Sequence, residues 1–326
     1  NDRGALPSLL MPGAHWRHKV VTTAVKLDLF SHLALHPSTA QGVALHLGGD
    51  ARALGVLLDG LTALQLLAKR GNTYVNTPVA DRYLVRGYPE YAGDQLIVDD
   101  LCWEIWGRLE EVLLRGRPAI GESIFRDDAV MTEHLLRGLH QDALAIAPKI
   151  ADALPLVEHH HILDVGGGAG TYALSFVRDH PNLQASIFDL PNAAEVARQT
   201  VDSWGLTGRV AIIVGDFLRD ELPRGHDLIF MSNVLHGQPP EENAGLFHRV
   251  AQAVEPGGLV AVHDVIMDPG LTSPAWGAIF SVNMLVHTAG GRCYCLREIV
   301  GWMEEAGLTE ISHRASQSLV VGRRPA

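Results

Sequence analysis

The 326-residue sequence predicts two domains: residues 1–155, mainly helical, and residues 156–326, a doubly wound parallel sheet of the α/β class. Three observations predict this fold. Apolar residues of the first half recur at helical spacing, with short β-rich segments only near its middle. From residue 162 onward, short β-rich apolar runs alternate with helical stretches. A glycine-rich turn over residues 164–170 joins the first of these runs to the helix that follows it.

The expected elements of residues 1–155 begin with helices. Apolar spacing predicts a helix over residues 20–33, and a Ser-Thr pair at residues 38–39 caps the start of a second. Asp50 caps a third helix over residues 51–67, whose leucines share one face. Residues 69–76 contain a Gly-Asn turn between short strands, which indicates a β-hairpin. Three helices followed by a hairpin describe a winged-helix domain.

Charge argues against a nucleic-acid partner for this domain. The formal net charge is −11, and Arg52 is the only cation of the helix that would enter a DNA groove. We therefore expect a structural or dimerisation role. No apolar run reaches the roughly 18 residues that cross a bilayer, so we expect no membrane segment. The three cysteines form no CxxC pair, which favours a reducing cytoplasm over a disulfide framework.

The elements of residues 156–326 follow the pattern of a doubly wound sheet. Five short apolar runs are expected as parallel strands: residues 162–165, 185–188, 210–214, 228–230 and 259–262. Helical stretches separate them, notably residues 193–204 and 241–254. After a further helix over residues 296–306, the segments 309–313 and 318–321 are joined by a turn. This C-terminal antiparallel hairpin would set one antiparallel strand into the parallel sheet.

The glycine-rich turn predicts the class of cofactor. A dinucleotide fingerprint, GxGxxG, would need a third glycine at position 171, where Thr171 stands. The observed pattern is acid-x-G-x-G-x-G, beginning at Asp164. This form suits a cofactor without a pyrophosphate, in which the acid can meet the amino-acid end of adenosylmethionine.

Two further acids follow the next two strands. Asp189 lies 23 residues beyond Gly166, a distance that suits a carboxylate gripping ribose hydroxyls. Asp216 and Phe217 follow the third strand and are placed to bracket an adenine. Either acid by itself is also consistent with a helix cap. Three acids at successive strand ends, after an acidic glycine turn, predict a nucleoside cofactor site.

Taken as a set, these segments resemble the plant-type and bacterial small-molecule O-methyltransferases, which include caffeate and acetylserotonin methyltransferases. Further matching segments are Leu27-Asp28-Leu29-Phe30, Val234-Leu235-His236 and Glu255-Pro256-Gly257-Gly258, so the resemblance covers nearly the whole chain. It implies a Rossmann-like methyltransferase sheet, S-adenosylmethionine as cofactor, an intertwined homodimer and a substrate cavity between the domains. The expected cofactor-binding residues are Asp164, Gly166, Gly168, Asp189, Leu190, Asp216, Phe217 and Ser232.

The resemblance also implies that His236, just after the fourth strand, is the catalytic base. Methyl transfer from a sulfonium is an in-line displacement, so the enzyme mainly aligns the reactants and relieves the nucleophile of its proton. A phenol has a pKa near 10, and a histidine, with a pKa near 6.5, can accept its proton. Asp264, after the fifth strand, is the second expected catalytic residue, which orients His236 or contacts the substrate.

The chain departs from the family at two positions near this base. The family usually continues His-Asp-Trp, whereas Gly237 follows the histidine here. A glutamate commonly follows a later Gly-Gly-Lys, and Cys293 stands at that position. The usual two-acid support of the base is therefore reduced.

Aromatic and sulfur-containing side chains predict a flat apolar pocket for a small aromatic metabolite with a hydroxyl group. Trp103 and Trp106 share one helical face, a spacing that fits core packing equally well. Trp276 joins the same set, and Arg292 is a weaker candidate for a substrate carboxylate. The expected substrate-binding residues are Trp103, Trp106, Met131, Phe280, Met284 and His287.

Two alternatives remain open. His236 and His287 could hold a metal that chelates a 2-oxo acid, which would make the protein a metal-assisted C-methyltransferase. No local motif such as His-x3-His supports ligation, so the leading prediction contains no metal. The other alternative is non-catalytic: a fold relative that keeps the cofactor without the transfer, or a winged-helix regulator.

Overall fold

The computed structural model describes residues 13–119, 128–314, 316 and 318–326. It divides into two compact units, Asn1–Cys102 and Trp103–Ala326. The helices that follow Cys102 therefore group with the sheet-containing unit, although the sequence predicts the domain boundary after residue 155. The boundary of the folding domains stays a proposal, because compactness alone does not measure independent folding.

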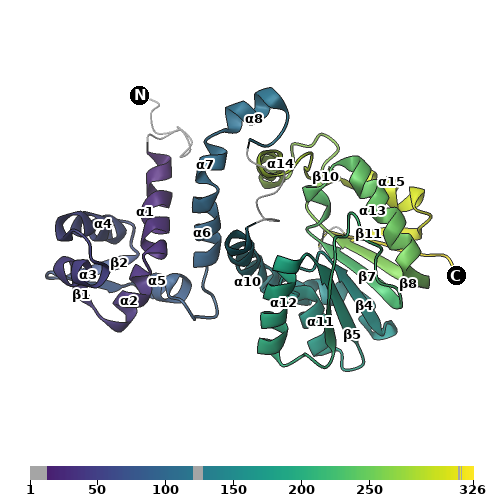
Figure 1. Cartoon of the computed structure of the whole chain (residues 1–326), viewed down its shortest axis with the longest axis horizontal. Coiled ribbons are helices and arrows are strands. Elements are labelled where there is room, and N and C mark those ends of the chain that lie inside the picture. Colours follow the sequence, from purple (N-terminus) through teal and green to yellow (C-terminus); the bar gives the residue numbers. More distant parts are fainter. Residues whose placement is uncertain (1–12, 120–127, 315, 317) are drawn as a thin grey trace. The chain divides into compact units, whose positions relative to one another are not determined.

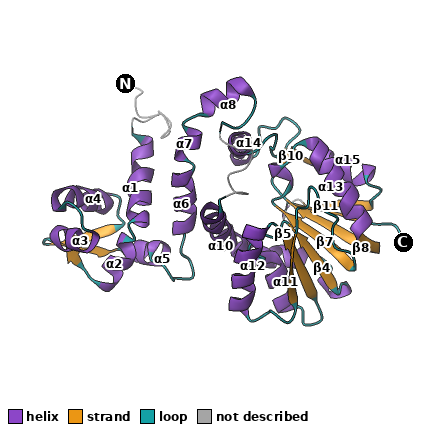
Figure 2. Cartoon of the chain, in the orientation of Figure 1, coloured by secondary structure: helices purple, strands orange, loops and turns teal. Residues whose placement is uncertain are grey.

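The first unit is mainly helical, with a small antiparallel sheet in the order β1-β3-β2 (Figures 1 and 2). Leu29, Phe30, Leu58 and Leu61 are fully buried in its core. The predicted hairpin is confirmed, because β2 pairs with β3 across the Gly-Asn turn. The elements are α1 Ala14–Lys26, α2 Leu29–Leu35, β1 Ser38–Thr39, α3 Ala40–Leu47, α4 Ala51–Ala63, β2 Leu67–Arg70, β3 Thr73–Asn76, α5 Pro78–Leu84 and α6 Gly93–Leu101.

Two helix predictions in this unit are wrong at their boundaries. The segment 20–33 is not one helix, because Asp28 adopts a left-handed conformation (φ 50°) between α1 and α2. Apolar spacing continues across that break and conceals it, and aspartate is one of the residues that tolerate this conformation. The helix from Ala51 ends at Ala63, since Gln65 is also left-handed (φ 62°) and Leu67 already pairs in β2.

The second unit contains the predicted doubly wound sheet, in the order β11-β12-β8-β7-β4-β5-β6. Strands β8, β7, β4, β5 and β6 are parallel, and β12 runs antiparallel to β8 and β11, so the predicted antiparallel strand is confirmed. The strands are β4 His161–Val165, β5 Gln184–Asp189, β6 Val210–Val214, β7 His226–Ser232, β8 Val254–His263, β11 Thr309–Arg314 and β12 Leu319–Arg323.

Helices cover both faces of this sheet (Figure 1). Strand residues alternate between two hydrophobic cores: Ile162 packs into the core with α11 and α12, and Leu163 packs into the core with α13 and α15. Period-two alternation inside a parallel strand therefore buries both faces. The helices are α11 Thr171–Asp179, α12 Pro191–Trp204, α13 Pro240–Ala253 and α15 Leu296–Glu305.

The second unit also contains elements outside the sheet layers. The longest, α10, packs against α11 and α12, and α14 packs against α7, α8 and the 3-10 turn η4. A short parallel pair, β9 with β10, follows the end of β8. These elements are α7 Trp103–Trp106, α8 Leu109–Arg115, α10 Ala129–Ala153, η4 Leu235–Gly237, β9 Ile266–Met267, α14 Ala275–His287 and β10 Tyr294–Cys295. No helix in the described part of the chain is long and apolar enough to cross a membrane.

Candidate functional site

The glycine-rich turn lies between β4 and α11, at the carboxyl edge of the sheet where ligands bind in open α/β folds. Gly166, Gly168 and Gly170 all have positive φ, which favours glycine. A Cβ on Gly166 would lie 2.8 Å from Val234 Cγ2, and one on Gly170 would lie 2.4 Å from Ile187 Cδ1. The turn therefore has both the conformation and the close packing that exclude side chains.

Asp164 lies in β4, two residues before the first glycine of this turn. It is 1% exposed, and neither carboxylate oxygen has a hydrogen-bond partner of ordinary geometry among the described residues. Burial raises the pKa of Asp164 to about 7; the backbone N–H of Ala173 lowers it, and the charge of Asp189 raises it further. A buried carboxyl group without a firm partner is characteristic of a ligand site, since native proteins seldom leave such a group unsatisfied.

Asp189 ends β5 and meets the glycine turn. Its Oδ2 accepts a hydrogen bond from the Gly168 N–H at 2.8 Å, and its Oδ1 accepts one from the Leu190 N–H at 2.7 Å. Asp164 and Asp189 therefore lie at the ends of the adjacent strands β4 and β5, next to the glycine turn, as the sequence predicted.

Asp216 and Phe217 follow β6 at the same edge. The phenyl ring of Phe217 lies against the turn, since a Cβ on Gly166 would be 3.4 Å from its Cε1. Asp216 also makes a local turn: its Oδ1 accepts a hydrogen bond from the Leu218 N–H at 3.0 Å, and Arg219 Nε lies 3.5 Å from Oδ2. The structural role considered for this acid and a ligand-binding role are both consistent with its position.

These residues fit an adenosyl amino acid. The turn is open to close backbone approach, Asp164 has unsatisfied acceptors for a cationic group, and Phe217 places an aromatic ring beside Gly166. Carboxylates at two neighbouring strand ends suit ribose hydroxyls.

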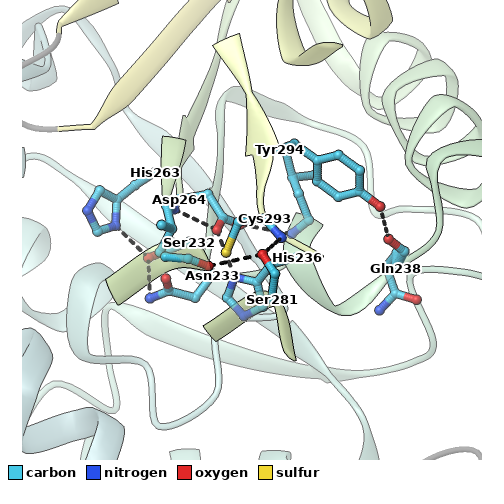
Figure 3. Close-up of polar contacts among 12 residues, drawn as sticks. Ser232, Asn233, His236, Gln238, His263, Asp264, Ser281, Cys293 and Tyr294 are labelled. Carbon is cyan, nitrogen blue, oxygen red and sulfur yellow. Dashed lines mark hydrogen bonds and ion pairs between the residues drawn. The ribbon is translucent and has the colours of Figure 1, made fainter. Parts of the chain in front are cut away.

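Ser232, at the end of β7, belongs to a half-buried polar cluster that sequence reasoning missed. Its Oγ lies 2.9 Å from His263 Nδ1 (Figure 3), and the Tyr172 hydroxyl lies 3.4 Å from the same nitrogen. Burial lowers the pKa of His263, and Asp264 partly offsets that effect. The sequence offered two signals for this cluster: a histidine at the end of the fifth strand, and a tyrosine one residue after Thr171.

His236 and Asp264 form a buried pair (Figure 3). His236 Nδ1–H donates to Asp264 Oδ1 at 2.7 Å, and the two side chains are 11% and 3% exposed. The backbone N–H groups of Leu235 and Val265 donate to the same carboxylate at 3.1 and 2.7 Å. Burial by itself raises the pKa of Asp264, but His236, the Val265 N–H and His263 together hold it below its usual value. The carboxylate is therefore ionised and fixes the imidazole.

Aromatic rings flank the base on α14. Phe280 packs edge-to-face on the His236 ring, with centroids 4.9 Å apart, and stacks on Trp276 at 4.8 Å with an interplanar angle of 11°. Trp276 is 63% exposed. On α7, Trp106 Nε1–H donates to Asn283 Oδ1 at 3.2 Å, which joins α7 to α14.

The other predicted substrate residues lie on elements of the same unit. Trp103 is 40% exposed on α7, and Met131 and Met284 are buried on α10 and α14. His287 Nδ1 lies 2.9 Å from the Asn283 carbonyl oxygen, and burial lowers the pKa of His287. Of the predicted aromatic residues, the structure thus shows Phe280 in contact with the base and Trp276 stacked on Phe280.

Two further groups bear on the predictions. Arg292 pairs with Glu298 at 2.5 Å and stacks over the Tyr294 ring, so its charge is already partnered. Across the described ranges, no group of three or more His, Cys, Asp or Glu side chains has a geometry that could hold a metal ion.

Comparisons with known proteins agree with this geometry. A profile of the O-methyltransferase domain matches residues 106–309, and a profile of the O-methyltransferase dimerisation domain matches residues 10–86. The 3-hydroxy-5-methyl-1-naphthoate 3-O-methyltransferase of Streptomyces sahachiroi is 32% identical over 91% of this chain and 87% of its own. The tetracenomycin polyketide synthesis 8-O-methyl transferase of Streptomyces glaucescens is 32% identical over 99% and 98%. An O-methyltransferase family protein from Burkholderia thailandensis has a similar structure, with a TM-score of 0.88, 26% identity and 99% of both chains covered.

Proposed function

Because this chain belongs to the O-methyltransferase family, we propose that it transfers a methyl group from S-adenosylmethionine to a hydroxyl group of a small aromatic metabolite, with His236 as general base. The two Streptomyces relatives act, by their names, on a naphthoate and on a tetracenomycin polyketide. A fused-ring phenol of secondary metabolism is therefore the substrate class that we infer.

The His236–Asp264 pair is the observation that carries this proposal. Asp264 accepts the Nδ1 proton, so the lone pair of Nε2 is the site at which the imidazole accepts a second proton. The carboxylate is itself held by two backbone N–H groups, which keeps the ring in one orientation. A buried imidazole held in one orientation suits general-base catalysis on a phenol.

In this reaction the protein forms no covalent bond with the substrate. When bound, the cofactor supplies a methyl group on a sulfonium. The chain's own residues align the hydroxyl oxygen and hold its proton on His236 as the oxygen becomes nucleophilic. A phenol with a pKa near 10 is almost entirely protonated at neutral pH, so an imidazole that accepts its proton as the bond to the methyl group forms makes the oxygen a better nucleophile.

For the cofactor, we propose the set predicted from the sequence. Gly166 and Gly168 let the backbone approach it, Asp164 receives the ammonium of its amino-acid end, and Asp189 with Leu190 receives the ribose. Asp216, Phe217 and Ser232 complete the site. The hydrogen bond between the Asp189 carboxylate and the Gly168 N–H supports this arrangement, because it fixes both groups at one strand edge.

For the substrate, we propose a flat apolar wall. Phe280 and Trp276 present stacked rings beside the base, which suits a planar ring system. Trp106, held by Asn283, and Met284 on the same helix extend that wall. Trp103, Met131 and His287 complete the proposed set.

We also propose a homodimer formed through residues 10–86, which match the O-methyltransferase dimerisation domain. Light scattering of the purified chain is expected to give twice the monomer mass of 35.3 kDa across the micromolar range. A monomer mass throughout that range would contradict the dimer.

A product assay tests the proposed reaction. We expect the protein with S-adenosylmethionine to convert 1-naphthol to its methyl ether, with one S-adenosylhomocysteine formed per ether, and to leave 1-naphthylamine and phenylpyruvate unmodified. Mass spectrometry and NMR of the products locate the methyl group. Methylation of phenylpyruvate at carbon, above all if it required added Zn²⁺ or Fe²⁺, would replace the O-methyl proposal with the metal-assisted alternative.

A further inference from the structure

Side chains outside the turn that carries His236 make contacts with the backbone of that turn. The base lies in η4, between the end of β7 and the start of α13. Asp264 orients its ring, but the position of the ring also depends on the backbone of residues 235–238. The acids that the family usually places nearby are replaced by Gly237 and by Cys293, which is 1% exposed. Burial raises the pKa of the Cys293 thiol, so this side chain is neutral.

Asn243, on the first turn of α13, is fully buried. Its Nδ2 donates to the carbonyl oxygen of Leu235 at 3.0 Å and to that of Gln238 at 3.4 Å. One amide group thus links the residue before the base to the residue that ends the turn. Such side-chain bonds to backbone carbonyls restrict a turn without adding charge near the base.

Tyr294, on β10, also holds this turn (Figure 3). Its hydroxyl donates to the Gln238 carbonyl oxygen. The residue is 2% exposed, and burial raises its pKa well above the usual value, so the hydroxyl remains a donor at working pH. Trp302 packs edge-to-face on the ring at 4.8 Å, and the Arg292 guanidinium lies 4.4 Å from the ring centroid, which fixes the hydroxyl in place.

The loop before β10 also packs on the base. A Cβ on Gly291 would lie 2.3 Å from the His236 carbonyl oxygen, so this backbone is in direct contact with the turn. The Gly291 N–H donates to Thr288 Oγ1 at 2.9 Å, which anchors the loop to the end of α14. The carbonyls of Leu235, His236 and Gln238 are therefore all contacted from outside the turn.

We propose that Asn243 and Tyr294 are positioning residues that fix the His236 turn through its backbone carbonyls, in place of the acidic support that the family usually supplies. The proposal rests on the proposed role of His236 as base. Misplacement of a reacting group by about 1 Å can cost about a hundred-fold in rate. Each single variant removes only part of this anchoring, so we expect smaller losses from the single variants.

The test uses Tyr294→Phe and Asn243→Ser in the full-length protein. We expect each to lower kcat for 1-naphthol by about ten-fold, and to leave the Kd for S-adenosylhomocysteine within about two-fold. Amide hydrogen exchange of Gln238, whose N–H donates to the Leu235 carbonyl, is expected to accelerate at least about ten-fold. The matched control is Tyr74→Phe, which removes a buried hydroxyl that donates to Asp59 at 2.8 Å in the other unit and should change neither quantity.

The same variants in a His236→Ala background separate positioning from general damage. If Tyr294 acts through the base, Tyr294→Phe has no further effect on kcat once His236 is absent. An equal ten-fold loss in both backgrounds, or an unchanged kcat and Gln238 exchange rate in the single variants, would overturn the proposal. If His236→Ala retained full activity, the base assignment would fail and the positioning role would fail with it; an inactive His236→Ala beside a fully active Tyr294→Phe would refute the positioning role alone.

Discussion

Replacement of His236 by alanine is expected to lower kcat for a phenolic substrate by about a thousand-fold, with the Kd for S-adenosylhomocysteine unchanged within about two-fold. The pair with Asp264 is buried and joined at 2.7 Å, so the imidazole is oriented before the substrate arrives. Alanine removes the group that accepts the phenol proton. The glycine turn and its acids lie at the ends of β4, β5 and β6, so the cofactor should still bind.

Single-turnover kinetics and isothermal titration measure these two quantities separately. His248→Ala is the matched control, because His248 is exposed on α13 and the substitution should leave kcat unchanged. A loss in His236→Ala that grew smaller as the pH approached the pKa of the phenol would add support, since hydroxide then does the work of the base. Unchanged turnover in this variant would remove His236 from the mechanism.

The sheet could be predicted from the sequence because its signals are local. Apolar runs of strand length, separated by helical stretches, locate β4 to β8, and the constraints on glycine at Gly166, Gly168 and Gly170 are properties of the turn itself. The break at Asp28 is local too, but a pattern of apolar spacing cannot register a single left-handed residue. The short β9–β10 pairing was missed because its two strands are too short to produce a pattern and their paired residues lie 28 positions apart.

The substrate-binding part of the site was harder to predict from the sequence, for a different reason. Its side chains lie on α7, α10 and α14, whose order along the chain says little about which faces meet. Phe280 contacts the base, whereas His287, seven residues further along α14, bonds to the carbonyl of Asn283. The bonds from Asn243 and Tyr294 reach backbone carbonyls, which every residue has, so no side-chain motif marks the acceptors.

Gly166→Ala is expected to raise the Kd for S-adenosylhomocysteine about a hundred-fold. Gly166 has a φ of 67°, and the new Cβ would lie 2.8 Å from Val234 Cγ2 and 3.4 Å from Phe217 Cε1. The left-handed backbone conformation of alanine and this steric overlap together cost about 3 kcal/mol. The turn can reduce that cost only by moving the backbone that we propose to hold the cofactor. That free energy corresponds to about a hundred-fold in Kd.

Gly205→Ala is the control that separates the effect of contacts at the cofactor site from the effect of backbone strain. Gly205 ends α12 with a φ of 68°, and a Cβ there would have nothing within 4 Å. The backbone strain of the two substitutions is therefore the same, about 1–2 kcal/mol, and only the contacts differ. Calorimetric titration with S-adenosylhomocysteine should find Gly205→Ala equal to the unsubstituted protein in affinity, with a lower melting temperature. Equal affinity in Gly166→Ala would mean that the turn after β4 does not bind the methyl donor, and the acids at the ends of β4, β5 and β6 would then have only structural roles.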